Sequence, residues 1–193
     1  DANGQPYLYY EDMVGGHSGG NDPEQQAKLL ALRYTYLMQQ LMDEDGPAAP
    51  VDVDGLERLQ RAHLTRVPFD SLDVFAGVPV RTDIDWSIPK IVDRGRGGWC
   101  YELNGAFAWL LRELGFAVKV RGATVLLTSD PMTRAHLALE IALERPYLVD
   151  VAFGDSFIRP LPLDDPGPHD GGTGPYRFEL RGSLGADLPA LLV

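Results

Sequence analysis

The first fifty residues combine two patterns of apolar positions. Residues 7–10 form a short aromatic run with strand character, and the glycine-rich residues 15–20 predict a loop. Apolar residues then recur every three or four positions through residues 22–41, which predicts an amphipathic helix capped by Asp22. Residues 43–50 are acidic and contain prolines, and we interpret them as a boundary between two parts of the chain. The apolar face of the helix consists of Ala27, Leu30, Tyr34, Leu37, Met38 and Leu41.

Helical spacing returns after this boundary. Residues 56–63 predict a short helix, and residues 88–92 predict a helical turn. The strongest helix is predicted to begin at Cys100 and to stop at Gly115, because glycine commonly terminates helices. Its apolar face consists of Leu103, Phe107, Leu110, Leu111 and Leu114.

Strand patterns follow the strongest helix. We predict strands over residues 118–127, 136–143 and 147–151, and the turn near Pro146 indicates that the last two form an antiparallel hairpin. Residues 160–175 are dominated by proline, glycine and aspartate, which predicts a loop or linker.

Composition excludes several classes of function. The chain has 193 residues, 45% of them hydrophobic, and a formal net charge of -11 without a basic stripe, which argues against nucleic-acid partners. No apolar run approaches the ~20 residues that span a bilayer, and no signal peptide is recognisable, so we expect no membrane partner and a cytoplasmic protein. Cys100 is the only cysteine, which excludes an intramolecular disulfide and a cysteine-rich metal site.

Cys100 is placed where a helix favours a thiolate. Gly97 and Gly98 leave backbone N–H groups uncrowded just before the helix, so its positive end points at the sulfur. This dipole is worth only ~0.3–1 kcal/mol at an exposed site, and the carboxylate of Glu102 opposes it. We therefore expect a neighbouring imidazolium to complete the activation of the thiol.

The histidine best placed for that role is His136. His63 lies on the apolar side of a helix and His169 lies in the segment rich in proline and glycine, so both are expected to be structural or exposed. His136 opens a predicted strand, and Asp150 lies in a very apolar stretch of the neighbouring strand, where a carboxylate needs a partner. Pairing the two would orient the ring beside Cys100 as in a catalytic triad. The spacing alone favours another interpretation, a buried structural cysteine and an ordinary cross-strand pair.

Residues 96–104, Arg-Gly-Gly-Trp-Cys-Tyr-Glu-Leu-Asn, resemble the signature Arg-Gly-Gly-x-Cys-x-Glu-x-Asn of arylamine N-acetyltransferases, and the similarity spans about residues 51–163. The resemblance implies an α+β fold, a helical bundle followed by an antiparallel β-barrel-like sheet, with a papain-like Cys-His-Asp triad formed by Cys100, His136 and Asp150. A C-terminal α/β lid that helps bind CoA completes the fold of this family.

The resemblance also implies a reaction. A thiolate takes the acetyl group of acetyl-CoA, and a small aromatic amine or hydrazine then removes it; no metal is involved. Phe69, in a stretch similar to the family's Pro-Phe-Glu-Asn, would line the acceptor pocket, although a core aromatic is an equal alternative. Ala135 and Ala152 depart mildly from the family pattern. Because the chain ends where the lid should begin, we expect residues 45–193 to be a truncated acetyltransferase-like region.

Residues 1–44 are expected to be a separate segment. Ser18 lies in a G-x-S-x-G sequence, but a nucleophile elbow needs a strand directly before it and a helix at the serine, and neither is predicted. Residues 5–42 instead resemble the C-terminal end of prolyl oligopeptidase-type serine hydrolases, in which His17 would match a catalytic base whose serine and aspartate are absent here. The sequence is thus interpreted as a join of two protein fragments.

Two other hypotheses remain open at this point. The same Cys-His-Asp set could serve another acyltransferase such as an amide synthase, or a thiol hydrolase, because a triad does not specify the acyl donor. The chain could also be an inactive fusion or fragment with exposed apolar surface.

Overall fold

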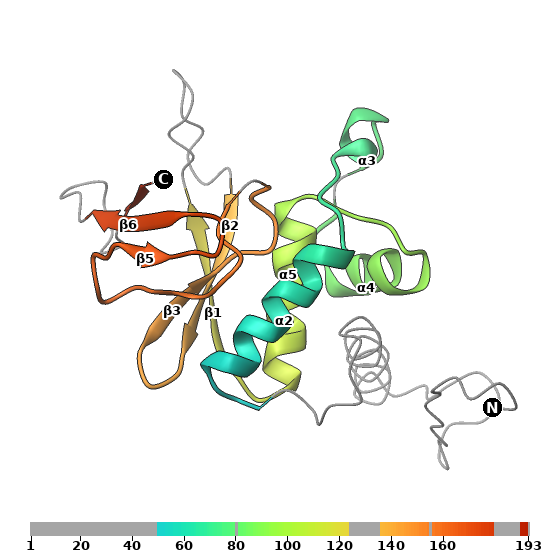
Figure 1. Cartoon of the computed structure of the whole chain (residues 1–193). Coiled ribbons are helices and arrows are strands. Elements are labelled where there is room, and N and C mark those ends of the chain that lie inside the picture. Colours follow the sequence, from blue (N-terminus) through green and yellow to red (C-terminus); the bar gives the residue numbers. More distant parts are fainter. Residues whose placement is uncertain (1–49, 80, 124–135, 155, 180–189, 193) are drawn as a thin grey trace, which may run out of the picture.

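A computed structural model describes residues 50–79, 81–123, 136–154, 156–179 and 190–192 (Figure 1). The predicted strand over 7–10, the predicted helix over 22–41, and both Ser18 and His17 lie outside the described residues.

The helical part of the fold precedes the sheets in the chain. Asp52 caps α2 (Val53–Arg66) by accepting a hydrogen bond from the backbone N–H of Gly55, so the helix predicted over residues 56–63 extends further in both directions. After α3 (Leu72–Phe75) come α4 (Ile84–Ile88) and the π-helical turn η1 (Pro89–Asp93), which together enlarge the turn predicted over residues 88–92. The last helix, α5 (Cys100–Glu113), begins at the predicted residue and ends before Gly115, whose φ is +96°.

The main sheet has the antiparallel order β1-β2-β3-β4, formed by β1 (Ala117–Ala123), β2 (His136–Ala142), β3 (Pro146–Val149) and β4 (Leu161–Pro162). Leu139 pairs with Val149 and Ile141 with Tyr147, which confirms the predicted hairpin.

The loop predicted over residues 160–175 is confirmed only in part, because short strands interrupt it. These residues contain β4, β5 (His169–Asp170) and the start of β6 (Pro175–Glu179), and β5-β6-β7 form a second sheet with β7 (Ala190–Leu192). The glycines and prolines belong to tight turns between very short strands; Gly167 and Gly172, for example, have φ values of +85° and +83°. This sheet is held by a small apolar cluster of Phe157, Leu161, Tyr176 and Phe178.

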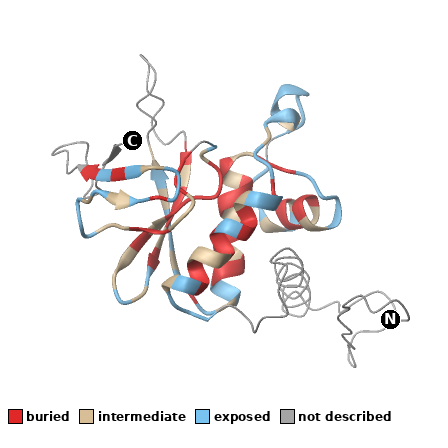
Figure 2. Ribbon diagram, viewed as in Figure 1, coloured by how far each residue is buried: buried red, intermediate tan, exposed pale blue. Residues whose placement is uncertain are grey.

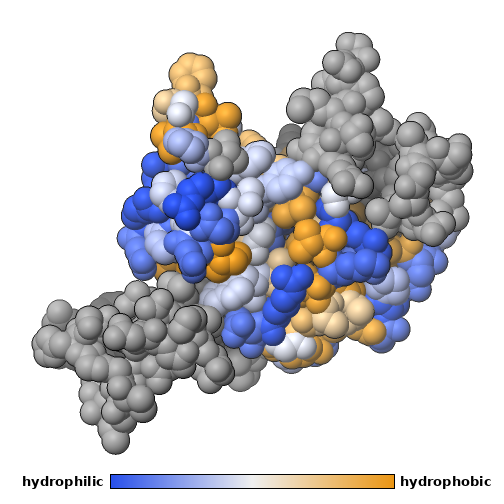
Figure 3. All heavy atoms as spheres, turned by 180° about the vertical axis from the view of Figure 1, so that it is seen from behind, coloured by the Kyte–Doolittle hydropathy of each residue, from blue (hydrophilic) through white to orange (hydrophobic). Residues whose placement is uncertain are grey.

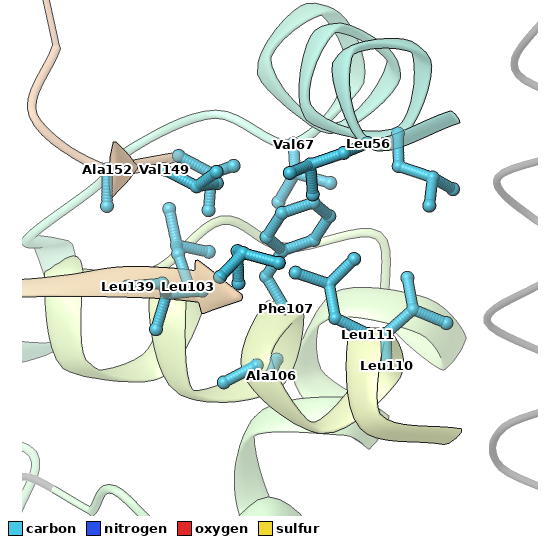
Figure 4. Close-up of a cluster of buried hydrophobic side chains, with 14 of the residues drawn as sticks. Leu56, Val67, Leu103, Ala106, Phe107, Leu110, Leu111, Leu139, Val149 and Ala152 are labelled. Atoms are coloured by element: carbon cyan, nitrogen blue, oxygen red, sulfur yellow. The ribbon is translucent and has the colours of Figure 1, made fainter. Parts of the chain in front are cut away.

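One apolar core joins the helices to the main sheet. Buried residues follow the facing sides of α2, α5 and the strands (Figure 2). The ring of Phe107 on α5 points toward Leu56 and Val67, while Leu139 and Val149 of the sheet lie along the same cluster (Figure 4). This packing fixes α5, and therefore its first residue, against the start of β2.

A small arm projects from the body at α3. Seen from behind, apolar side chains gather at its tip (Figure 3), where Leu72, Val74 and Phe75 are exposed. Among the described residues, no helix is both long and apolar enough to cross a membrane.

Candidate active site

Cys100 is the first residue of α5, and its side chain is buried. The residues before it run beside another segment of the chain: Phe69 and Gly98 form a parallel bridge, and the backbone N–H of Asp70 donates to the carbonyl of Gly98 at 2.9 Å. This bridge brings Phe69 next to the thiol.

The two glycines before Cys100 are required by close approach. A Cβ atom on Gly97 would lie 2.1 Å from the carbonyl oxygen of Pro68, and one on Gly98 would lie 2.6 Å from a carboxylate oxygen of Glu102. Any larger residue would push these segments apart. Close approach is thus a second reason for glycine at these positions, besides the uncrowded N–H groups expected from the sequence.

The structure brings His136 and Asp150 together with Cys100. Because Leu139 pairs with Val149, Asp150 lies just past the end of β3, opposite Ala138, and its carboxylate reaches back to His136. The distance from Nε2 of His136 to Oδ2 of Asp150 is 2.5 Å, and both side chains are buried. The imidazole also hydrogen-bonds the thiol of Cys100, so the three side chains form a continuous chain of contacts.

Opposing effects set the charge of His136. Burial alone would lower the pKa of the ring, but the hydrogen bonds and charges of Asp150 and Cys100 outweigh it and raise the pKa of His136 to about 9. The ring is therefore an imidazolium at neutral pH, which is the charge state expected to stabilise a thiolate beside it.

Asn104 and Gln60 hold Asp150 in place, and sequence reasoning assigned neither a role. The amide nitrogen of Asn104 donates to Oδ1 of Asp150 at 2.9 Å, and its carbonyl accepts from the backbone N–H of Val151 at 3.0 Å. Gln60 donates to the backbone carbonyl of Asp150 at 3.3 Å. The spacing of Asn104 four residues after Cys100 was an available signal, because it places both on one face of α5.

Glu102 has a partner that the sequence did not indicate. Its carboxylate, expected to oppose ionisation of the thiol, is 4% exposed and accepts hydrogen bonds from Lys90 Nζ at 2.9 and 3.1 Å. It also accepts from the indole N–H of Trp86 at 3.0 Å and the backbone N–H of Trp99 at 3.2 Å. The negative charge is thus balanced by a buried ammonium.

The buried thiol opens onto a small apolar hollow of about 250 Å³. The ring of Phe153 meets the ring of His136 edge-on, with centroids 5.0 Å apart. Phe69 is 51% exposed, so it is a wall of this hollow and not a core aromatic. The lining consists of Phe69, Cys100, His136, Ala152, Phe153 and Gly154.

The other described histidines lie away from this hollow. His63 is fully buried with its ring edge-on to Phe107, and burial lowers the pKa of His63 to about 3, so it is a neutral core residue. His169 lies on β5 and contacts the backbone carbonyl of Asp165 at 2.8 Å.

Comparisons with known proteins agree with this architecture. A family model described as N-acetyltransferase matches residues 52–186, further toward the C-terminus than the 51–163 expected from motifs. An arylamine N-acetyltransferase of Mycolicibacterium smegmatis is 35% identical over 147 residues, 72% of this chain; the chain thus spans about half, 53%, of that relative's length.

Two solved structures give the same picture. Nocardia farcinica arylamine N-acetyltransferase superposes with a TM-score of 0.73 at 30% identity, covering 89% of this chain and 62% of that one. The Mycobacterium marinum enzyme in complex with CoA gives a TM-score of 0.69 at 31% identity, covering 82% and 63%.

Proposed function

Because the chain belongs to the arylamine N-acetyltransferase family, we propose that it transfers an acetyl group from acetyl-CoA to a small aromatic amine or hydrazine through a thioester on Cys100. The observation that carries this proposal is the buried set of contacts from the thiol of Cys100 through His136 to Asp150. We assign Cys100 as nucleophile, His136 as proton carrier and Asp150 as the group that orients and charges the ring.

The resting site is an ion pair in this proposal. His136 holds the proton, with one ring nitrogen toward Cys100 and Nε2 toward Asp150. The thiolate at the positive end of α5 is then a strong nucleophile without any further base.

In the first half-reaction the thiolate attacks the carbonyl carbon of the acetyl thioester. The new S–C bond forms as the bond to the CoA sulfur breaks, and the departing CoA thiolate takes the proton from His136. The products are acetylated Cys100, free CoA and a neutral imidazole.

In the second half-reaction the neutral ring acts as the base. The amine nitrogen attacks the acetyl carbon on Cys100 and transfers a proton to His136, and the C–S bond breaks. The amide leaves, and the thiolate–imidazolium pair is restored, so protons and electrons balance over the cycle.

The lining and the size of the hollow support an aromatic acceptor and the binding of one substrate after the other. Phe69 and Phe153 offer aromatic faces on which a planar amine can stack. At about 250 Å³, the hollow formed by the described residues is smaller than the roughly 300–1,000 Å³ of ordinary ligand pockets, which favours one small group at a time beside the sulfur. The solved Mycobacterium marinum relative in complex with CoA supports CoA as the carrier of the donor.

Steady-state assays test the proposal. Formation of the acetylated amine is measured while acetyl-CoA and an aromatic amine are varied, with Cys100→Ser as the matched control. We expect parallel lines in double-reciprocal plots and no product from the control. Amide formation by Cys100→Ser at the wild-type rate would refute the role of the thiol, and a preference for a different acyl thioester would identify another acyltransferase.

A further inference from the structure

A buried lysine lies behind the first turn of α5. Lys90, in η1, is 2% exposed, and its ammonium contacts Glu102 at 2.9 Å and Asp73 at 2.7 Å. A lysine is rarely buried unless it is paired, and here the pairing joins three separate segments of the chain. Lys90 is not one of the residues that line the hollow beside Cys100.

The position of Glu102 makes this lysine relevant to the thiol. Glu102 is two residues after Cys100 in the same helical turn, and its carboxylate accepts from the backbone N–H of Trp99, directly before the cysteine. An uncompensated carboxylate at this place would cancel the positive end of the helix and repel a thiolate. Two hydrogen bonds from Lys90 balance that charge.

We propose that Lys90 is a positioning residue of the acyl-transfer site: it holds and neutralises the Glu102 carboxylate, so that the first turn of α5 favours the thiolate of Cys100. The inference deepens the proposed function, because it concerns the activation of the same nucleophile.

The other charged groups near Lys90 are Asp73, Arg96 and Asp70. Asp73 is shared between Lys90 and Arg96, and Arg96 also lies 3.8 Å from Asp70. The hydrogen bond from Lys90 is the main reason why the pKa of Asp73 is lowered. The charged groups that contact the thiol or its partner ring are His136 and Asp150. Lys90 is therefore the cation that contacts Glu102 directly.

The experiment follows the reactivity of Cys100 toward an alkylating agent as the pH is varied. Cys100 is the only cysteine in the chain, so every labelling event reports on it. The reaction needs no acyl donor, and its outcome is therefore independent of whether the chain acetylates amines. The variants are Lys90→Met, Lys90→Arg, Glu102→Gln and the double variant Lys90→Met/Glu102→Gln, each checked for folding by circular dichroism.

Lys90→Met is expected to move the midpoint of alkylation about one pH unit higher, because Glu102 becomes uncompensated. Lys90→Arg and the double variant are expected to return the midpoint to the wild-type value, since the first restores the cation and the second removes the charge it balances. A folded Lys90→Met with an unchanged midpoint, or a double variant that keeps the shift, would overturn the proposal.

Glu102→Gln decides the question if Lys90→Met does not fold. Removing the carboxylate while Lys90 remains is expected to move the midpoint to lower pH, because the lysine charge is then less balanced. A midpoint that stays at the wild-type value in this variant would overturn the proposal.

Discussion

Replacing Asp150 by asparagine keeps the size of the side chain and removes its charge. The Oδ1 position can still accept from Asn104 and from the backbone N–H of Ala152, as it does now at 2.9 Å in both cases. The Oδ2 position becomes an NH₂ group, which donates to Nε2 of His136 where the carboxylate accepts. The ring must then carry its proton on the nitrogen that faces Cys100, and it can no longer take one from the thiol.

The magnitude follows from the pKa of His136. The rise from 6.5 to about 9 corresponds to roughly 3 kcal/mol in favour of the protonated ring. Without the carboxylate, only the contact with Cys100 still raises the pKa of His136 while burial lowers it, so the imidazolium fraction at neutral pH falls. Because the neutral ring also carries its proton on the wrong nitrogen, we expect the rate at which Cys100 is acetylated in a single turnover to fall at least about tenfold.

The same substitution changes how stability depends on pH. Because the folded-state pKa of His136 lies above the unfolded-state value, the protonated ring stabilises the fold fully below pH 6.5, and this contribution is lost as the pH rises through about 9. Asp150→Asn should remove that loss of stability from denaturant titrations.

Asp164→Asn is the matched control, because Asp164 is a surface carboxylate paired with Arg145. It should leave both the acetylation rate and the pH profile unchanged. A folded Asp150→Asn protein with the wild-type rate and the wild-type profile would refute the assigned role of the carboxylate.

Four further substitutions test the surroundings of the site. Gly97→Ala should destabilise the fold by about 1–3 kcal/mol in urea titrations, because the added Cβ has no space. Gly105→Ala should instead stabilise α5 by roughly 0.5–1 kcal/mol, because its Cβ meets nothing within 4 Å. Equal effects of the two substitutions on stability would contradict this account. His63 is neutral in the fold because its pKa is lowered, so stability should fall as the pH drops below 6.5, and His63→Gln should weaken that dependence in thermal melts. Asn104→Ala should cost about 1–3 kcal/mol and slow acetylation, since it frees the Asp150 carboxylate; an unchanged acetylation rate would show that Asp150 is held without it.

Local signals explain what could be predicted from the sequence. The start and end of α5 follow from the helical spacing of apolar residues and from Gly115, and the β2–β3 hairpin follows from two apolar runs around Pro146. Both features depend on residues close together in the chain. The motif around Cys100 likewise identified the nucleophile candidate and, by resemblance, its two partners.

Long-range contacts explain what could not be predicted. Gln60 reaches Asp150 across ninety positions of the chain, and nothing in the local pattern of α2 indicates that partner. The pairing of Glu102 with Lys90 was missed because Lys90 comes from a separate turn. The second sheet was missed because strands such as β5 have two residues, too few to establish an alternating pattern.

The most direct test of acyl transfer through Cys100 is the mass of the intact protein after brief incubation with acetyl-CoA alone. Addition of one acetyl group, located on the peptide that contains Cys100 and lost when an aromatic amine is added, is the predicted result. A protein that forms acetylated amine but never carries the group on this sulfur would contradict the mechanism.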